Sequence, residues 1–237
     1  MTDGTFVEAV AKNRREPVKL DERVFTPNDW TEREEKQYSA TALNLHTLTG
    51  LRDYIASALD PSTPTALHVI DHETVQLVGA LEPDARYRRN VYATAVVPGC
   101  TGFAFETFME SEKFIIGLQS LFDDTAERND LLKFVASIKE NTVRDTTDSG
   151  YAQEVVVRQA VELTRAAVPN PAVLKPWRTF REVGQPSSKF LLRVREGGGD
   201  KPTLALFESD GGAWQLAAIE SIAAWLRKEV PGVPVIA

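Results

Sequence analysis

Three adjacent residues, Asp71, His72 and Glu73, carry side chains of the kind that bind metal ions or move protons in enzymes. They lie between two runs rich in β-branched residues, 66–70 and 74–78, so we expect them at the turn of a β-hairpin. Neighbouring residues of an extended chain point in alternate directions, and three of them seldom converge on one ion without help from elsewhere. We therefore favour a solvated hairpin tip, with a metal-binding or acid–base site as the alternative.

A second polar segment, 208–212, joins an expected strand to an expected helix, which is a position where backbone N–H groups can bind phosphate. Its glycines match neither a Walker loop nor a dinucleotide-binding fingerprint. The carboxylates of Glu208 and Asp210 would also repel an anion. We therefore expect Asp210 to cap the helix, while Gly211 and Gly212 allow a sharp turn.

Five basic residues are concentrated on consecutive expected strands in the last third of the chain. They are Arg178, Arg181, Lys189, Arg193 and Arg195. Phe190, Leu192 and Val194 alternate with the last two arginines and are expected to face the core. The basic face that results suggests contact with a nucleic-acid backbone. The nearby Glu182 and Glu196 favour the alternative, an ion-paired solvent face or a subunit contact.

Acidic residues elsewhere leave open a carboxylate-bound Mg²⁺ site of the kind that nucleases use. The candidates are Glu106, Glu110, Asp123, Asp124, Asp145 and Asp148. Their spread matches solvated helix ends and turns better than it matches a motif. Cys100 has no histidine beside it in the sequence, so we expect a small residue at a strand end rather than a nucleophile. We therefore lean towards a protein that is not an enzyme, and we expect no cofactor, no bound metal and no catalytic residue.

The chain has 237 residues, of which 43% are hydrophobic, and this suffices for a core without disulfides. Its single cysteine excludes an intramolecular disulfide and a multi-cysteine zinc site. Residues 1–8 lack the features of a signal peptide and no apolar run spans a bilayer, so we expect a cytoplasmic protein without a membrane partner. The formal net charge of −7 argues against a protein that coats duplex DNA, although a local basic face is compatible with it.

We expect an α+β fold of mostly antiparallel strands with hairpins, a central helical pair, and a C-terminal helix packed on the sheet. A polar and irregular N-terminal arm, 1–39, precedes a single body, 40–237, with a candidate sub-boundary near 141–150. Alternation and turn residues define the expected strands. These lie at 42–45, 66–70, 74–78, 90–97, near 143, and at 153–158, 177–183, 190–195, 203–208 and 233–237.

Apolar residues at helical spacing predict four helices. The first is capped by Thr49 and closed by Pro61. Two more, which begin near Ser111 and Asp130, form the central pair. The last runs from about Gly212 to Lys228 and is expected to pack on the sheet formed by the strands before it. Its apolar stripe contains Trp214, Ala218, Ile222 and Trp225.

Three uncommon strings of residues occur in the body. They are EKFIIGLQS at 112–120, RTFREVGQP at 178–186 and ALFESDGGAW at 205–214. In their order and spacing, residues 40–237 resemble the YfdQ-like family of phage and prophage proteins. The resemblance does not cover the arm. It implies an accessory gene of a temperate phage, often found in early or recombination gene neighbourhoods, and it carries over no catalytic residues.

Our first hypothesis is a phage or prophage accessory protein that acts by binding and by homo-oligomeric self-assembly. The expected partners are further copies of the chain and a host or phage protein. Phe25 and Trp30 are the candidate self-association residues, because aromatic anchors commonly dominate interfaces. They dock the arm either on a neighbouring subunit or on its own body. The second hypothesis is a nucleic-acid-binding protein or metal-dependent nuclease in phage DNA replication or recombination, which would use the five basic residues.

Overall fold

The computed structural model describes residues 18–20, 23–25, 41–60, 64–81, 89–99, 102–139, 142–148, 153–159, 162–198 and 201–237. The chain divides into two compact units, unit 1 with residues 1–41 and unit 2 with residues 42–237.

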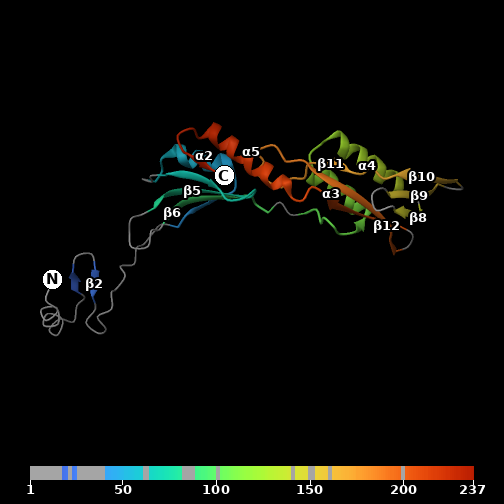
Figure 1. Ribbon diagram of the computed structural model, residues 1–237, viewed down its shortest axis with the longest axis horizontal. Helices are drawn as coiled ribbons and strands as arrows, with labels where there is room; N and C mark the ends of the chain where they lie inside the picture. The colour runs from blue at the N-terminus through green and yellow to red at the C-terminus, as the bar shows by residue number, and fades with distance from the viewer. Residues whose placement is uncertain are drawn as a thin grey trace. The chain divides into compact units, whose positions relative to one another are not determined.

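The described part of unit 1 is a hairpin, in which β1 (Val18–Leu20) pairs antiparallel with β2 (Arg23–Phe25). Val18 lies opposite Phe25. The arm was expected to be mostly irregular, and these six residues of it form two short strands (Figure 1). Phe25 ends β2, whereas Trp30 lies outside the described residues.

Unit 2 contains a mixed five-stranded sheet in the order β14-β4-β5-β6-β3. The central strands β4 (Ala66–Val69), β5 (Thr74–Leu81) and β6 (Arg89–Val96) pair antiparallel, which confirms the expected hairpin between β4 and β5. The short edge strands, β3 (Leu43–Leu45) and β14 (Val235–Ile236), each pair parallel with their neighbour. The two edges are therefore the exception to the antiparallel arrangement.

Helices α2 (Leu48–Ser57) and α5 (Ala213–Glu229) pack on this sheet (Figure 1). Leu51, Leu77 and Leu226 are almost completely buried in the shared core. The expected packing of the C-terminal helix on a sheet is confirmed. The sheet is the five-stranded one, β14-β4-β5-β6-β3, and not the one formed by the strands directly before the helix.

The strands that precede α5 belong to a second, antiparallel sheet in the order β11-β12-β13-β7. These strands are β11 (Ala172–Leu174), β12 (Ser188–Glu196), β13 (Pro202–Glu208) and β7 (Met109–Glu110). Phe190, Leu192 and Val194 are fully buried, which confirms the alternation predicted for β12.

The central helical pair, α3 (Ser111–Leu121) and α4 (Ala126–Lys139), shares the core of this second sheet. Phe114 and Leu118 are fully buried on the predicted face of α3. Helix α4 begins four residues before the predicted Asp130. Arg128 N donates to Thr125 Oγ1 (3.2 Å) at this earlier start, which satisfies a backbone group of the first turn.

A further sheet in the order β10-β9-β8 contains the expected hairpin of β8 (Thr142–Asp148) and β9 (Gln153–Gln159). Its third strand, β10 (Glu162–Ala167), was not predicted. Together, the helices packed on separate sheets confirm the α+β fold class. None of the described helices is both long and apolar enough to cross a membrane.

Candidate functional site

The segment 177–183 was predicted to be a strand, and this prediction is wrong. The buried side chain of Gln185 holds the segment as a loop. Gln185 Oε1 accepts hydrogen bonds from Arg178 N (2.8 Å) and Thr179 N (3.2 Å), and its Nε2 donates to Phe180 O (3.1 Å). Backbone groups that would have bonded to a neighbouring strand are therefore satisfied by one carboxamide.

This loop, 177–186, joins the two cores of unit 2. Phe180 and Val183 are buried in the core of the five-stranded sheet. Thr179 Oγ1 donates to His72 O (2.5 Å) at the turn between β4 and β5. Arg178, by contrast, lies against residues of the four-stranded sheet. Neighbouring residues of the loop therefore contact both sheets.

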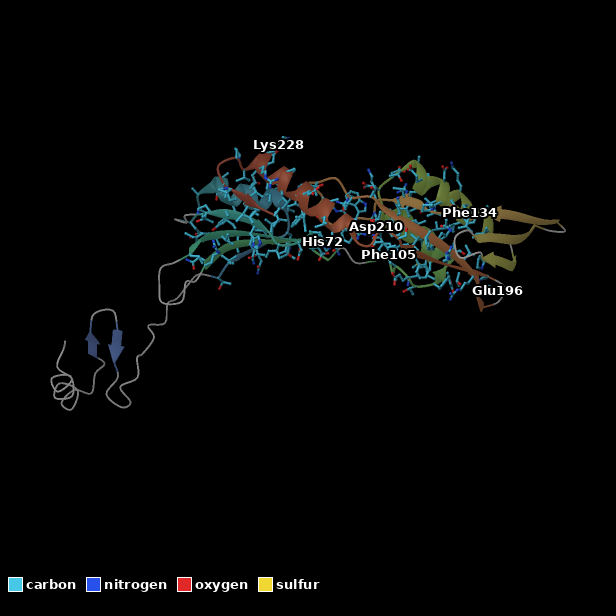
Figure 2. The ribbon with its side chains drawn as sticks, in the orientation of Figure 1. His72, Phe105, Phe134, Glu196, Asp210 and Lys228 are labelled. Atoms are coloured by element: carbon cyan, nitrogen blue, oxygen red, sulfur yellow. The ribbon has the colours of Figure 1, made fainter. Side chains whose placement is uncertain are left out.

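Arg178 lies among aromatic rings, and only 11% of its side chain is exposed. Its Nη1 donates to Glu208 Oε1 (2.5 Å). Its guanidinium carbon is 4.4 Å from the ring centroid of Trp214, 4.8 Å from that of Phe105 and 5.3 Å from that of Phe190. Phe105 and His72 both lie where the two sheets approach each other (Figure 2). Arg178 was predicted on a basic strand face, but it is an internal cation that links α5 to the second sheet.

The other predicted basic residues lie in two places. Lys189, Arg193 and Arg195 are on β12, on the face opposite its buried residues. The guanidinium carbon of Arg195 is 4.1 Å from the ring centroid of Phe108. Arg181 is in the loop, with its guanidinium carbon 4.5 Å from the ring centroid of Trp177. The sequence placed all five on strands, but only Lys189, Arg193 and Arg195 lie on one, β12. Nucleic-acid binding by the five residues stays a prediction.

A cavity of about 350 Å³ lies beside the loop, and we call it the junction cavity. Its described walls come from the residues between β3 and α2, the chain between β6 and β7, the end of α3, and the loop itself with Pro176 before it. Its apolar lining consists of Val97, Pro98, Phe103, Phe105, Leu121, Pro176, Trp177 and Phe180. Its polar lining consists of His46, Thr47, Ser120, Arg178, Arg181 and Glu182. Sequence reasoning missed the cavity, because these segments are far apart in the chain.

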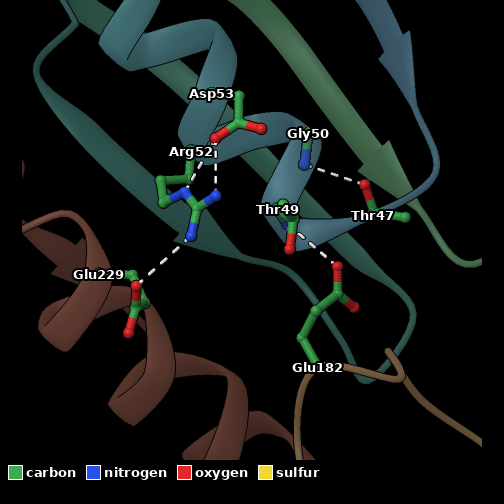
Figure 3. Close-up of polar contacts among 7 residues, drawn as sticks. All are labelled: Thr47, Thr49, Gly50, Arg52, Asp53, Glu182 and Glu229. Carbon is green, nitrogen blue, oxygen red and sulfur yellow. Dashed lines mark hydrogen bonds and ion pairs between the residues drawn. The ribbon is translucent and has the colours of Figure 1, made fainter.

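His46 and Thr47, directly before α2, line one polar side of the junction cavity. Figure 3 shows the polar contacts at the start of this helix. Thr47 Oγ1 accepts from Gly50 N (2.9 Å), so Thr47 is the N-cap rather than the predicted Thr49. Thr49 N donates instead to Glu182 Oε1 (3.0 Å), a carboxylate of the loop. The positive end of the helix dipole stabilises this carboxylate.

Two side chains of α2 away from the cavity have shifted pKa values. The hydrogen bond that Tyr54 donates to Asp60 Oδ2 (2.7 Å) raises the pKa of Tyr54 to about 12. The hydrogen bond and charge of Asp53 raise the pKa of Arg52. Arg52 Nη1 also lies 3.6 Å from Glu229 Oε2, which connects α2 to α5 (Figure 3).

The turn Asp71-His72-Glu73 is not the solvated tip that was favoured from the sequence. The ring of His72 meets that of Trp214 edge-on, with centroids 4.7 Å apart. Asp71 Oδ1 accepts from Glu73 N (2.8 Å), which closes the turn. The turn is therefore docked on α5 and on the loop. Among the described residues, no group of three or more histidine, cysteine, aspartate or glutamate side chains is arranged to hold a metal ion.

The segment 208–212 closes a turn before α5. Asp210 Oδ1 accepts from Gly212 N (3.1 Å), whereas the N-cap of the helix is Gly212 and not the predicted Asp210. The φ angles of Gly211 and Gly212, 64° and 80°, lie in the left-handed region that favours glycine. Cys100 and the side chains of Asp145 and Asp148 lie outside the described residues.

No family model, curated protein or solved structure matches this chain.

Proposed function

We propose that this protein acts by binding, and that the junction cavity is its site for a small molecule. The observation that carries the proposal is the composition of the cavity wall: aromatic and aliphatic side chains surround a few polar groups. A volume of about 350 Å³ falls in the range of small-molecule sites. Binding sites of this kind are common between two packed layers, where neither core fills the space completely.

The walls of the cavity are held by contacts that exist without a ligand. Glu182 is fixed by Thr49 N, and Arg178 by Glu208 and three aromatic rings. Preorganised walls lower the entropic cost of binding, because fewer side chains must be ordered when the ligand enters. This supports a binding function for the cavity rather than a packing defect.

A test of the cavity uses two neighbouring positions on α3. Ser120 lines the cavity and its Oγ donates to Ile116 O (2.7 Å) within the helix, whereas Gln119, which is also exposed, does not line the cavity. Phenylalanine at position 120 should fill the space, and phenylalanine at position 119 should not. Both variants and the unchanged protein are dialysed against a bacterial small-molecule extract, and retained compounds are identified by mass spectrometry.

We expect at least one compound to be retained by the unchanged protein and by Gln119→Phe, and to bind Ser120→Phe at least about tenfold more weakly. Identical retention by all three proteins, or no retained compound, would contradict the proposal. Thermal unfolding of both variants checks that any loss reflects the blocked cavity and not loss of the fold.

We also propose that the protein is a phage or prophage accessory protein and that it forms homo-oligomers through its arm. The source rests on the three residue strings at 112–120, 178–186 and 205–214. What supports self-association is the β1–β2 hairpin, because a two-stranded hairpin is marginally stable alone in water and gains stability by docking on another surface. Phe25, at the end of β2, and Trp30 are the proposed anchors.

Deletion of residues 1–39 should lower the mass of the oligomer in light scattering while the thermal unfolding of unit 2 is preserved. The reason is that both hydrophobic cores consist of residues from Leu48 onwards. The double substitution of Phe25 and Trp30 by serine should have the same effect on mass. A truncated protein that keeps its mass but loses stability would show that the arm docks on its own chain.

A further inference from the structure

We propose that the ligand of the junction cavity is a planar ring that carries one negatively charged group. The ring packs against the aromatic side of the cavity, and the charged group binds Arg181. This inference rests on the proposed function of the cavity and specifies the chemical class of its ligand. Two observations support it: most polar groups of the cavity wall already have partners, and the apolar side of the cavity is formed by aromatic rings.

Most polar groups of the wall are already occupied. Glu182 accepts from Thr49 N, and Ser120 Oγ donates to Ile116 O. His46 Nδ1 lies 3.4 Å from Val96 O. Arg178 Nη1 is paired with Glu208, whereas its Nε and Nη2 have no hydrogen-bond partner among the described residues but are buried, with the guanidinium surrounded by rings. A ligand that displaced the hydrogen bonds of Glu182, Ser120 and His46 would have to replace each of them. The unpartnered donors of Arg178 are covered by protein atoms, so they are less accessible to a ligand than those of an exposed side chain.

Arg181 differs from them. One face of its guanidinium lies over Trp177, and among the described residues it has neither a hydrogen bond nor a carboxylate partner. A cation over a ring keeps the N–H donors at its edge, and these donors suit the two oxygens of a carboxylate or phosphate. Arg181 is also exposed, so its donors are accessible to a ligand that enters from solvent.

The charges around the cavity favour a ligand with a single anionic group. Arg178 and Glu208 form a neutral pair. The charge of Glu182 is offset in part by the N-terminus of α2, on which it lies. Arg181 remains as the cation of the wall without an acidic partner among the described residues. One anionic group on the ligand neutralises it.

The apolar side of the cavity is a fixed aromatic surface. The ring centroid of Phe103 is 5.1 Å from those of Phe105 and Phe122 and 5.5 Å from that of Phe114. Behind it, α3 carries Gly117, where an added Cβ would lie 2.8 Å from Phe103 Cδ2. The glycine therefore lets the ring pack directly on the helix. A rigid aromatic surface of this kind, with Trp177 beside the cation, favours a flat ring over a flexible chain.

The test compares two isosteric probes, 1-naphthoate and its neutral analogue 1-naphthamide, by isothermal titration calorimetry with the full chain. 1-Naphthyl phosphate is a third probe that distinguishes a phosphate from a carboxylate source. Arg181→Gln removes the proposed contact. Arg195→Gln is the matched control, because Arg195 also lies over an aromatic ring, Phe108, but does not line the cavity.

We expect at least one of the two anionic probes to bind the unchanged protein and Arg195→Gln at least about tenfold more tightly than 1-naphthamide, and Arg181→Gln to abolish that preference. If all probes bind with equal affinity and Ser120→Phe blocks them, the charge preference is wrong while the cavity remains the site. Binding that is undiminished in Ser120→Phe would overturn the cavity itself. Absence of binding by every probe would overturn the inferred ligand class.

Discussion

Replacement of Arg178 by methionine is expected to lower the free energy of unfolding by about 3 kcal/mol. The side chain is 11% exposed, and that of its partner Glu208 is 27% exposed, so the substitution leaves a carboxylate beside aromatic rings without its cation. It also removes the cation from the faces of Trp214 and Phe105. Urea unfolding monitored by circular dichroism measures the change.

The double substitution Arg178→Met/Glu208→Gln separates the ion pair from the packing. If the lost pairing causes most of the effect, the double variant should be about 1–2 kcal/mol more stable than the sum of the single effects predicts. Arg195→Met is the control, because Arg195 also lies over a ring but is exposed, and it should cost less than about 1 kcal/mol. An effect of Arg178→Met as small as that of the control would contradict the role of Arg178 as an internal link.

Leu118→Asp is expected to leave the protein unfolded or insoluble, with a loss of more than about 4 kcal/mol. Leu118 is fully buried on α3, in the core shared with the second sheet, and an aspartate there would place an unpaired charge among apolar side chains. Ile116, two residues earlier on the same helix, is 57% exposed. Ile116→Asp should therefore change stability by about 0.5 kcal/mol or less.

The comparison of these two variants, by soluble yield and by thermal unfolding, tests the orientation of α3 directly. A soluble, stable Leu118→Asp variant would show that Leu118 does not face the hydrophobic core. If both variants are insoluble or unfolded, the helix is buried on all sides. The orientation matters for function, because the same helix presents Ser120 to the junction cavity.

Local patterns in the sequence are sufficient to predict most of the helices and strands. The alternation that buries Phe190, Leu192 and Val194 needs only the two-residue period of a strand, and the apolar face of α3 needs only helical spacing. Helix beginnings were less accurate. Thr47 and Thr49 are both of a residue type that caps helices, and the structure uses Thr47. The backbone N–H of Thr49 then lies in the first turn and donates to Glu182, a residue distant in sequence that no local pattern could identify.

The loop 177–186 could not be predicted, because its residues have the propensities of a strand. What decides its form is the buried Gln185, whose carboxamide takes the backbone hydrogen bonds of Arg178, Thr179 and Phe180. The pairing of Arg178 with Glu208 and the crossing of α5 to the first sheet are likewise long-range contacts. The junction cavity is lined by segments that are far apart in the chain, and therefore no local pattern indicates it.

Methyl NMR is the most direct test of the junction cavity as a ligand site. Val97 and Leu121 line the cavity, whereas Leu216 on α5 and Ile116 on α3 are exposed elsewhere. When 1-naphthoate or 1-naphthamide is added to the full chain, the ring current of the probe should shift the methyl resonances of Val97 and Leu121. Those of Leu216 and Ile116 should stay unchanged. Unshifted Val97 and Leu121 resonances at saturating probe, or shifts confined to the exposed methyl groups, would contradict binding in the cavity.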